Sequence, residues 1–251
     1  MTHTKLLSPF AATCMVVANM IGVGVFTSVG FQLPGLPSAP PILALWALGG
    51  LLSLCGALCY AELVAMMPRS GGEYHLLREA YHRIIGFMAG WISLVAGFAA
   101  PIALAASAFA RYAQAFGVNA EEHVLAAALV IAVTAINLMD DSVFGRFLSG
   151  FTVMKVLLIL AFIFGAIFLP GGVHNSLAPT PKDGAMFISP AFAISLVYVM
   201  YAYEGWNGAA YVAGEVEDPR KNMPRALVIG TVIVTLLYVA VHAVFLWRAP
   251  W

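Results

Sequence analysis

Seven long runs of apolar residues dominate the sequence, and a helix that crosses a lipid bilayer needs about 20 such residues. The runs cover residues 10–33, 41–66, 84–112, 122–139, 147–169, 187–213 and 224–247. They are continuous rather than alternating with polar residues, which excludes the strands of a membrane barrel. Apolar residues make up 62% of the 251 residues and charged residues 10%, where soluble domains have about 45–50% and about 25%. The sequence therefore predicts an all-α integral membrane protein.

The basic residues between the runs predict the orientation in the membrane, because Lys and Arg are concentrated in cytoplasmic loops. A cytoplasmic N-terminus puts eight basic residues inside and three outside. The eight are Lys5, Arg69, Arg78, Arg83, Arg146, Arg220, Lys221 and Arg225, and the three are Arg111, Lys182 and Arg248. We therefore expect a cytoplasmic N-terminus and a location in the cytoplasmic (inner) membrane. The net charge is zero and no basic patch is dense enough for nucleic acid.

Two runs contain residues that interrupt a helix. The first reads Asn19-Met20-Ile21-Gly22-Val23-Gly24 and the sixth reads Tyr201-Ala202-Tyr203-Glu204-Gly205-Trp206-Asn207. Close packing between helices is an alternative explanation for the glycines of the first run. It does not explain Glu204, because a carboxylate at the centre of a spanning helix costs about 2.5–3.5 kcal/mol.

The positions of the two interruptions favour a transporter. Runs one and six cross the membrane in opposite directions, and corresponding interruptions in such segments are typical of inverted-repeat transporters. A broken helix exposes N–H groups that attract a carboxylate and C=O groups that attract an ammonium. Two such breaks therefore suit a zwitterionic amino acid as the substrate.

Four stretches of the chain resemble the amino acid–polyamine–organocation (APC) superfamily of transporters, with a leaning toward the L-type amino acid transporter branch. They are Ile21-Gly22-Val23-Gly24-Val25-Phe26, Tyr60-Ala61-Glu62-Leu63 with Pro68-Arg69-Ser70-Gly71-Gly72-Glu73-Tyr74, Tyr203-Glu204-Gly205-Trp206-Asn207, and the segment from Gly214 to Ala226. The resemblance implies the LeuT-type inverted-repeat fold, with helices 1 and 6 broken. It implies secondary active transport of amino acids by alternating access, either by proton symport or by exchange.

The resemblance also implies the residues of a substrate site. The carboxylate of the amino acid would meet the backbone N–H groups of Gly22, Val23 and Gly24. The ammonium would meet carbonyls near Asn19 and Met20 on one side and near Tyr201 and Ala202 on the other, and Ile21 also belongs to the implied site. Tyr201 stands where the family often has a gating aromatic residue.

Two residues depart from the family pattern. Val23 stands where many relatives have a hydroxyl residue, so one side-chain donor is missing. Glu204 stands where many L-type members have glycine, and its carboxylate would favour a cationic substrate or would itself titrate.

Lys155 is the one basic residue well inside a run, roughly 12 Å deep at 1.5 Å per residue. Snorkelling of its ammonium to the interface is the alternative to a function. The resemblance implies that Lys155 faces the first helix and takes part in coupling to protons.

Other residues have structural interpretations. The segment with Arg69, Glu73, Arg78 and Glu79 is expected to be a solvated cytoplasmic loop with local ion pairs. Asn222 and Pro224 suit the start of the seventh helix. His242 is expected to be hydrogen-bonded within the bundle.

The family fold needs ten core helices, so the chain is expected to be a partial amino acid permease domain over residues 1–251. A membrane fragment with a structural or regulatory role and an amine or polyamine exchanger remain alternatives. Sequence motifs of intramembrane enzymes are missing, so we expect a transporter rather than an enzyme. The expected partners are an amino acid, the lipid bilayer and protons, with no cofactor and no metal.

Overall fold

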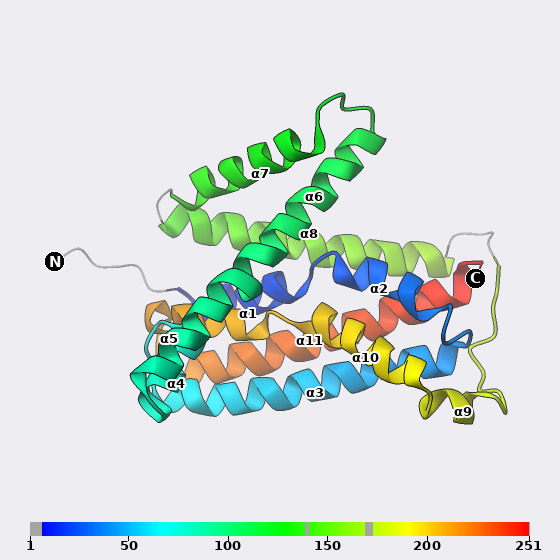
Figure 1. Ribbon diagram of the computed structural model, residues 1–251, viewed down its shortest axis with the longest axis horizontal. Helices are drawn as coiled ribbons and strands as arrows, with labels where there is room; N and C mark the ends of the chain where they lie inside the picture. Colours follow the sequence, from blue (N-terminus) through cyan, green and yellow to red (C-terminus); the bar gives the residue numbers. More distant parts are fainter. Residues whose placement is uncertain (1–6, 139–140, 169–172, 251) are drawn as a thin grey trace.

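The computed structural model describes residues 7–138, 141–168 and 173–250, which are helical apart from short connections and one isolated bridge (Figure 1). The α-helices are α1 (Pro9–Met20), α2 (Gly24–Gln32), α3 (Ala39–Met66), α4 (Gly72–Ala80), α5 (Arg83–Ile92), α6 (Ala100–Ala115), α7 (Glu122–Asn137), α8 (Asp141–Phe168), α9 (Asp183–Phe187), α10 (Pro190–Tyr203) and α11 (Pro219–Arg248). A π-helical segment, η1 (Ser93–Ala99), joins α5 to α6, and a 3₁₀ helix, η2 (Trp206–Glu215), follows α10. Lys5 lies outside the described residues.

Five helical stretches in the described part are long and apolar enough to cross a membrane. They are Pro9–Gln32, Ala39–Met66, Arg83–Ala115, Arg146–Phe168 and Pro219–Arg248. The other two predicted spans correspond to shorter helices, since α7 has 16 residues and α10 has 14. The all-helical, membrane-spanning character predicted from the sequence is therefore present, with two spans shorter than expected.

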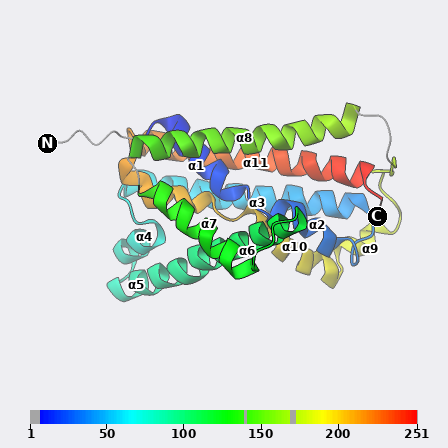
Figure 2. The same ribbon diagram turned by 90° about the horizontal axis from the view of Figure 1, so that it is seen from above.

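The core of the molecule lies around α11, which packs against α3 and α1 and also contacts α8 and η2 (Figures 1 and 2). Small residues allow these close approaches. A Cβ added to Gly50 would lie 2.2 Å from the Thr235 side chain, and one added to Gly230 would lie 2.6 Å from Val16. The close packing of α11 against α1 and α3 places its side chains beside the two helix breaks.

The two broken helices begin in the same way. Ser8 and Ser189 are the N-cap residues of α1 and α10, each accepts a hydrogen bond from a backbone N–H three residues on, and each is followed by proline. Serine at the N-cap and proline at the first helical position are both favourable. In Figure 1, α1 and α2 (blue) run from left to right, and α10 and η2 (yellow to orange) run back.

The third predicted span, 84–112, corresponds to α5, η1 and α6 in succession. Pro101 lies in the first turn of α6, directly after η1. Proline lacks an N–H and its ring clashes with the carbonyl four residues earlier, and a π-helical turn is one way to accommodate this. At Pro101 the structure therefore shows a change from π-helix to α-helix.

The expectation that Asn222 and Pro224 begin the seventh helix is wrong. α11 begins at Pro219, after Asp218 in a left-handed conformation with φ 43°. Asn222 instead donates to the carbonyl of Glu217, and Pro224 lies within the second turn. Pro219 has the same preference for the first helical position, and it comes earlier in the chain.

Candidate functional site

The first helix break separates α1 from α2. α1 ends at Met20, Ile21 is extended with φ −77° and ψ 97°, and α2 begins at Gly24. Within the described residues, no hydrogen bond is formed by the backbone N–H groups of Val23 and Gly24. Because these groups start a helix, they form a site of partial positive charge.

The second helix break separates α10 from η2. α10 ends at Tyr203, Glu204 is extended, and Gly205 has φ +113°, a conformation that favours glycine. η2 then continues as a 3₁₀ helix of 10 residues, with Val212 outside helical geometry. Runs of 3₁₀ helix beyond three or four residues are uncommon and often mark a strained or hinge segment.

The structure brings the two breaks into direct contact. A Cβ added to Gly24 would lie 3.3 Å from the backbone and side chain of Ala202, so α2 starts against the last turn of α10. A Cβ added to Gly205 would lie 2.5 Å from the Asn19 carbonyl oxygen. Segments almost 200 residues apart in sequence therefore meet at their irregular turns.

Tyr238, a buried residue of α11, connects the two breaks. Its hydroxyl donates to the Met20 carbonyl at 2.7 Å and lies 3.2 Å from the Ala202 carbonyl. Both carbonyls belong to helix ends, where intrahelical partners are missing. Tyr238 could not be predicted as a site residue, because nothing in the sequence of α11 indicates which carbonyls its hydroxyl faces.

Lys155 of α8 reaches the first break. Its Nζ lies 3.2 Å from the Ile21 carbonyl and 3.4 Å from the Ala18 carbonyl, and the side chain is half-buried. The ammonium also lies 5.9 Å from the centre of the Phe151 ring. The resemblance-based prediction that Lys155 faces the first helix agrees with this position.

An aromatic cluster packs around Tyr238. Trp46, Tyr203 and His242 surround it, with the His242 ring stacked 3.7 Å from that of Trp46. Nδ1 of His242 lies 2.8 Å from the Tyr238 carbonyl, so this nitrogen is the donor. The prediction that His242 is hydrogen-bonded within the bundle is confirmed.

Tyr201 and Glu204 lie on the exposed side of the second break. Tyr201 is 48% exposed, and its carbonyl accepts a hydrogen bond from the Glu204 N–H at 3.2 Å. The Glu204 carboxylate is exposed and has no hydrogen bond or ion pair with the described residues. It is therefore available to a ligand or to solvent rather than fixed by a neighbouring helix.

A second polar cluster lies at one end of η2 and was not predicted. Glu73 of α4 accepts hydrogen bonds from the Tyr60 hydroxyl at 3.0 Å and from the Asn207 side-chain amide. The other Glu73 oxygen and the Tyr211 hydroxyl are buried without a hydrogen-bond partner in the described part. The expected solvated loop is thus wrong for Glu73, although Arg78 and Glu79 do form a local ion pair at 3.9 Å.

Two hydrogen bonds join the loop before α4 to η2. The Gly71 N–H donates to the Tyr211 carbonyl, and the Gly214 N–H donates to the Ser70 hydroxyl. One indication of this cluster was present in the sequence, since Glu73 and Asn207 both belong to stretches that resemble the transporter family. Their pairing could not be read from a sequence in which 134 residues separate them.

The two breaks bring together groups of both charge signs. They combine helix-start N–H groups, helix-end carbonyls, one ammonium and one free carboxylate. In the described ranges, no group of three or more His, Cys, Asp or Glu side chains is placed to hold a metal ion.

Comparison with known proteins identifies the family of the chain. The profile of the family described as "Amino acid permease" matches residues 7–251. The chain is 31% identical to the b(0,+)-type amino acid transporter 1 of Mus musculus over 249 residues, which are 96% of this chain and 51% of the relative. It is 30% identical to the large neutral amino acids transporter small subunit 2 of Homo sapiens over 251 residues, or 96% and 47%. The chain thus spans about half the length of the curated relatives it matches.

Proposed function

This chain belongs to the amino acid permease family. We propose that its two helix breaks form part of an amino acid binding site, and that the protein uses this site for secondary active transport. The observation that carries the proposal is the contact between the breaks, at Gly24 against Ala202 and at Gly205 against Asn19. Family membership already separates the chain from enzymes, since its relatives are transporters.

In the proposed site, the substrate carboxylate accepts hydrogen bonds from the N–H groups of Gly22, Val23 and Gly24. A carboxylate at a helix start is stabilised by these donors and by the helix dipole. The ammonium lies among the carbonyls of Asn19, Met20, Ile21, Tyr201 and Ala202. The single proton of the Tyr238 hydroxyl is donated to the Met20 oxygen, with the Ala202 oxygen 3.2 Å away, and each carbonyl oxygen has two lone pairs.

The substrate class is proposed from the relatives. Their names specify amino acids, and one specifies large neutral amino acids. Glu204 is the reason to include cationic amino acids or amines, because its exposed carboxylate adds a negative charge beside the ammonium position. An amine or polyamine exchanger is therefore the second candidate.

The LeuT-type inverted repeat is proposed as the fold. Support comes from the opposite directions of the two broken helices and from their matching Ser-Pro starts (Figure 1). Seven crossings follow if α7 and the α10–η2 pair also span the bilayer. The charge distribution supports a cytoplasmic N-terminus in the inner membrane.

Coupling is proposed to depend on Lys155. A charged Lys155 donates to the Ile21 and Ala18 carbonyls and holds the end of α1. Loss of that proton would release α1, so a single proton would shift the equilibrium between two orientations. If the ammonium is instead permanent, Lys155 has only a structural role, and the protein is an exchanger or a facilitator.

The binding site can be tested on the 251-residue chain in nanodiscs by scintillation proximity with radiolabelled leucine and arginine. Gly22→Leu adds a side chain at an exposed position where a Cβ meets no atom within 4 Å. We expect at least a tenfold loss of binding without loss of stability. The matched control is Gly30→Leu in α2, which is equally exposed and open. Unchanged binding by Gly22→Leu would place the site elsewhere. If the wild-type chain and Gly22→Leu both fail to bind, the alternative of a non-transporting structural or regulatory fragment is favoured.

A further inference from the structure

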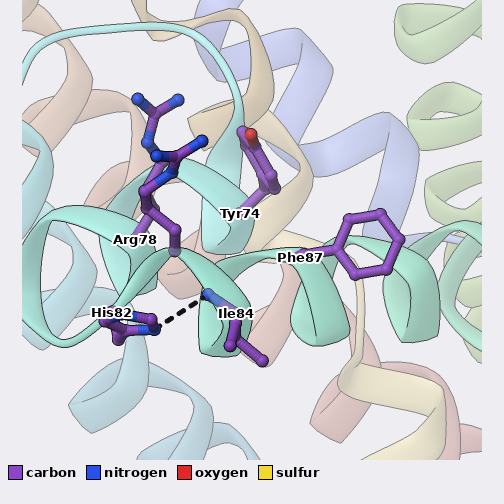
Figure 3. Close-up of a pocket in the computed structure, with 6 residues that line it drawn as sticks. Tyr74, Arg78, His82, Ile84 and Phe87 are labelled. Carbon is purple, nitrogen blue, oxygen red and sulfur yellow. Dashed lines mark hydrogen bonds between the residues drawn. The ribbon is translucent and has the colours of Figure 1, made fainter.

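A pocket of about 480 Å³ lies between α4 and α5, away from the helix breaks (Figure 3). Its lining consists of Tyr74, Arg78, His82, Arg83, Ile84 and Phe87. Figure 3 shows the Arg78 guanidinium and the Tyr74 hydroxyl reaching toward the same side of the hairpin. None of these residues is used in the proposed amino acid site.

The pocket has an excess of positive charge. Two of its six lining residues are arginines, and none is acidic. Glu79 makes only a long contact of 3.9 Å with Arg78, and both side chains are nearly half exposed. Glu73, the other nearby carboxylate, is turned inward to Tyr60 and Asn207.

Each polar side chain of the pocket carries a hydrogen-bond donor. His82 accepts a hydrogen bond from the Ile84 N–H at its Nδ1, so its Nε2 carries the proton in the neutral ring (Figure 3). The guanidinium groups and the Tyr74 hydroxyl are also donors. Several donors together with two fixed positive charges match the oxygens of a phosphate group.

An apolar surface continues from this polar pocket along α5. Ile84 and Phe87 in the pocket are 62% and 65% exposed, and Met88 and Trp91 follow on the same helix at 57% and 62%. A free anion gains nothing from such a surface, whereas an acyl chain can cover it. In the orientation proposed above, the start of α5 lies at the cytoplasmic membrane surface, where basic pockets bind acidic headgroups.

We propose that the pocket between α4 and α5 binds the phosphate headgroup of an anionic phospholipid, with the acyl chains along α5. The headgroup phosphate accepts hydrogen bonds from Arg78, Arg83 and His82. The proposal requires membrane insertion but not amino acid transport, so failure of one leaves the other standing.

The test is native mass spectrometry of the 251-residue chain with bound phosphatidylglycerol and phosphatidylcholine, supported by thermal melts in nanodiscs of each lipid. We expect phosphatidylglycerol to bind at least tenfold more tightly. Each arginine contributes about fivefold, so Arg78→Gln combined with Arg83→Gln lowers that affinity about 25-fold. Phosphatidylcholine has the same phosphate but no net charge, so its affinity should fall less and the preference for phosphatidylglycerol should be lost.

The matched control is Arg69→Gln, which removes a basic residue predicted to be cytoplasmic but outside the pocket. Equal losses in Arg69→Gln and the double variant would overturn the pocket assignment, because a diffuse surface charge would explain both. Inorganic phosphate is the third probe. Competition by phosphate at millimolar concentration would identify a site for a free anion and overturn the lipid assignment.

Discussion

Removal of the Tyr238 hydroxyl tests whether one side chain holds the two helix breaks together. Tyr238→Phe keeps the ring packed against Trp46 and Tyr203 and removes only the oxygen. That oxygen lies 2.7 Å from the Met20 carbonyl and 3.2 Å from the Ala202 carbonyl. Met20 and Ala202 are 2% and 5% exposed, so water cannot readily replace the lost donor.

The expected magnitude follows from this burial. A neutral hydrogen bond contributes about 0.5–1.5 kcal/mol net, but a buried group left without a partner costs about 1–3 kcal/mol. The Met20 carbonyl ends α1 and has no intrahelical donor. We therefore expect Tyr238→Phe to lower the free energy of unfolding by about 1–3 kcal/mol.

Tyr203→Phe is the matched control. Its hydroxyl donates to the Trp46 carbonyl at 2.9 Å and is equally buried. Trp46 lies in the interior of α3, where the helix itself supplies a donor to that carbonyl. The expected loss is therefore about 0.5–1.5 kcal/mol.

Equilibrium unfolding in mixed micelles, with SDS as denaturant, measures both variants. In the completed protein, Tyr238→Phe should also weaken substrate binding, because it loosens the contact between the breaks. Equal losses of stability in the two variants would refute the reasoning, since the position of the carbonyl at a helix end would then make no difference.

Four further predictions concern the breaks and one loop. Gly205→Ala should destabilise the protein more than Gly22→Ala does, because Gly205 has φ +113° and its Cβ would lie 2.5 Å from the Asn19 oxygen, while Gly22 has open space; the same SDS titration compares them. Glu204→Gln in the completed protein should change the ranking of cationic against neutral substrates by about 1–3 kcal/mol, the range of a lost charge-assisted hydrogen bond; competition uptake measures this, and an unchanged ranking would make Glu204 irrelevant to selectivity. Lys155→Gln should keep counterflow but lose the response to a pH gradient, and wild-type transport that is indifferent to the gradient would leave Lys155 a structural residue. Asp183 accepts hydrogen bonds from the backbone and hydroxyl of Thr180, and the backbone bond holds the pKa of its carboxyl below the ordinary 3.8. Protection of the Thr180 amide from hydrogen exchange should be full above pH 3.8 and be lost as the pH falls through the lowered pKa. Asp183→Ala, which removes the acceptor, should lose this protection at every pH.

The helix breaks could be predicted from the sequence because their signal is local. Gly22 and Gly24, and then Glu204 and Gly205, are poor helix residues within apolar runs. α1 ends two residues before Gly22, and α10 ends directly before Glu204. The start of α11 was placed wrongly because two prolines satisfy the same local rule. Only the surrounding structure selects Pro219 over Pro224.

The partners of the breaks could not be predicted, since they depend on which helices are neighbours. In the sequence, Tyr238 is one of several aromatic residues in apolar runs. Its hydroxyl nevertheless reaches the carbonyls of Met20 and Ala202, which are 218 and 36 residues away. The sequence suggests that Glu73 is a solvated loop residue, but its carboxylate accepts hydrogen bonds from Tyr60 and Asn207. Lys155 was recognised only because a buried ammonium is costly wherever it is found.

The short parallel bridge between Leu7 and Val216 fixes the start of α1 to the end of η2. Leu7 donates to the Glu215 carbonyl and accepts from the Glu217 N–H, at 2.7 and 3.0 Å. The two broken segments are therefore clamped at this end of the bundle as well as near their centres. They cannot separate there without loss of both hydrogen bonds. A movement that opens this end while the bridge is intact must therefore move the start of α1 and the end of η2 together.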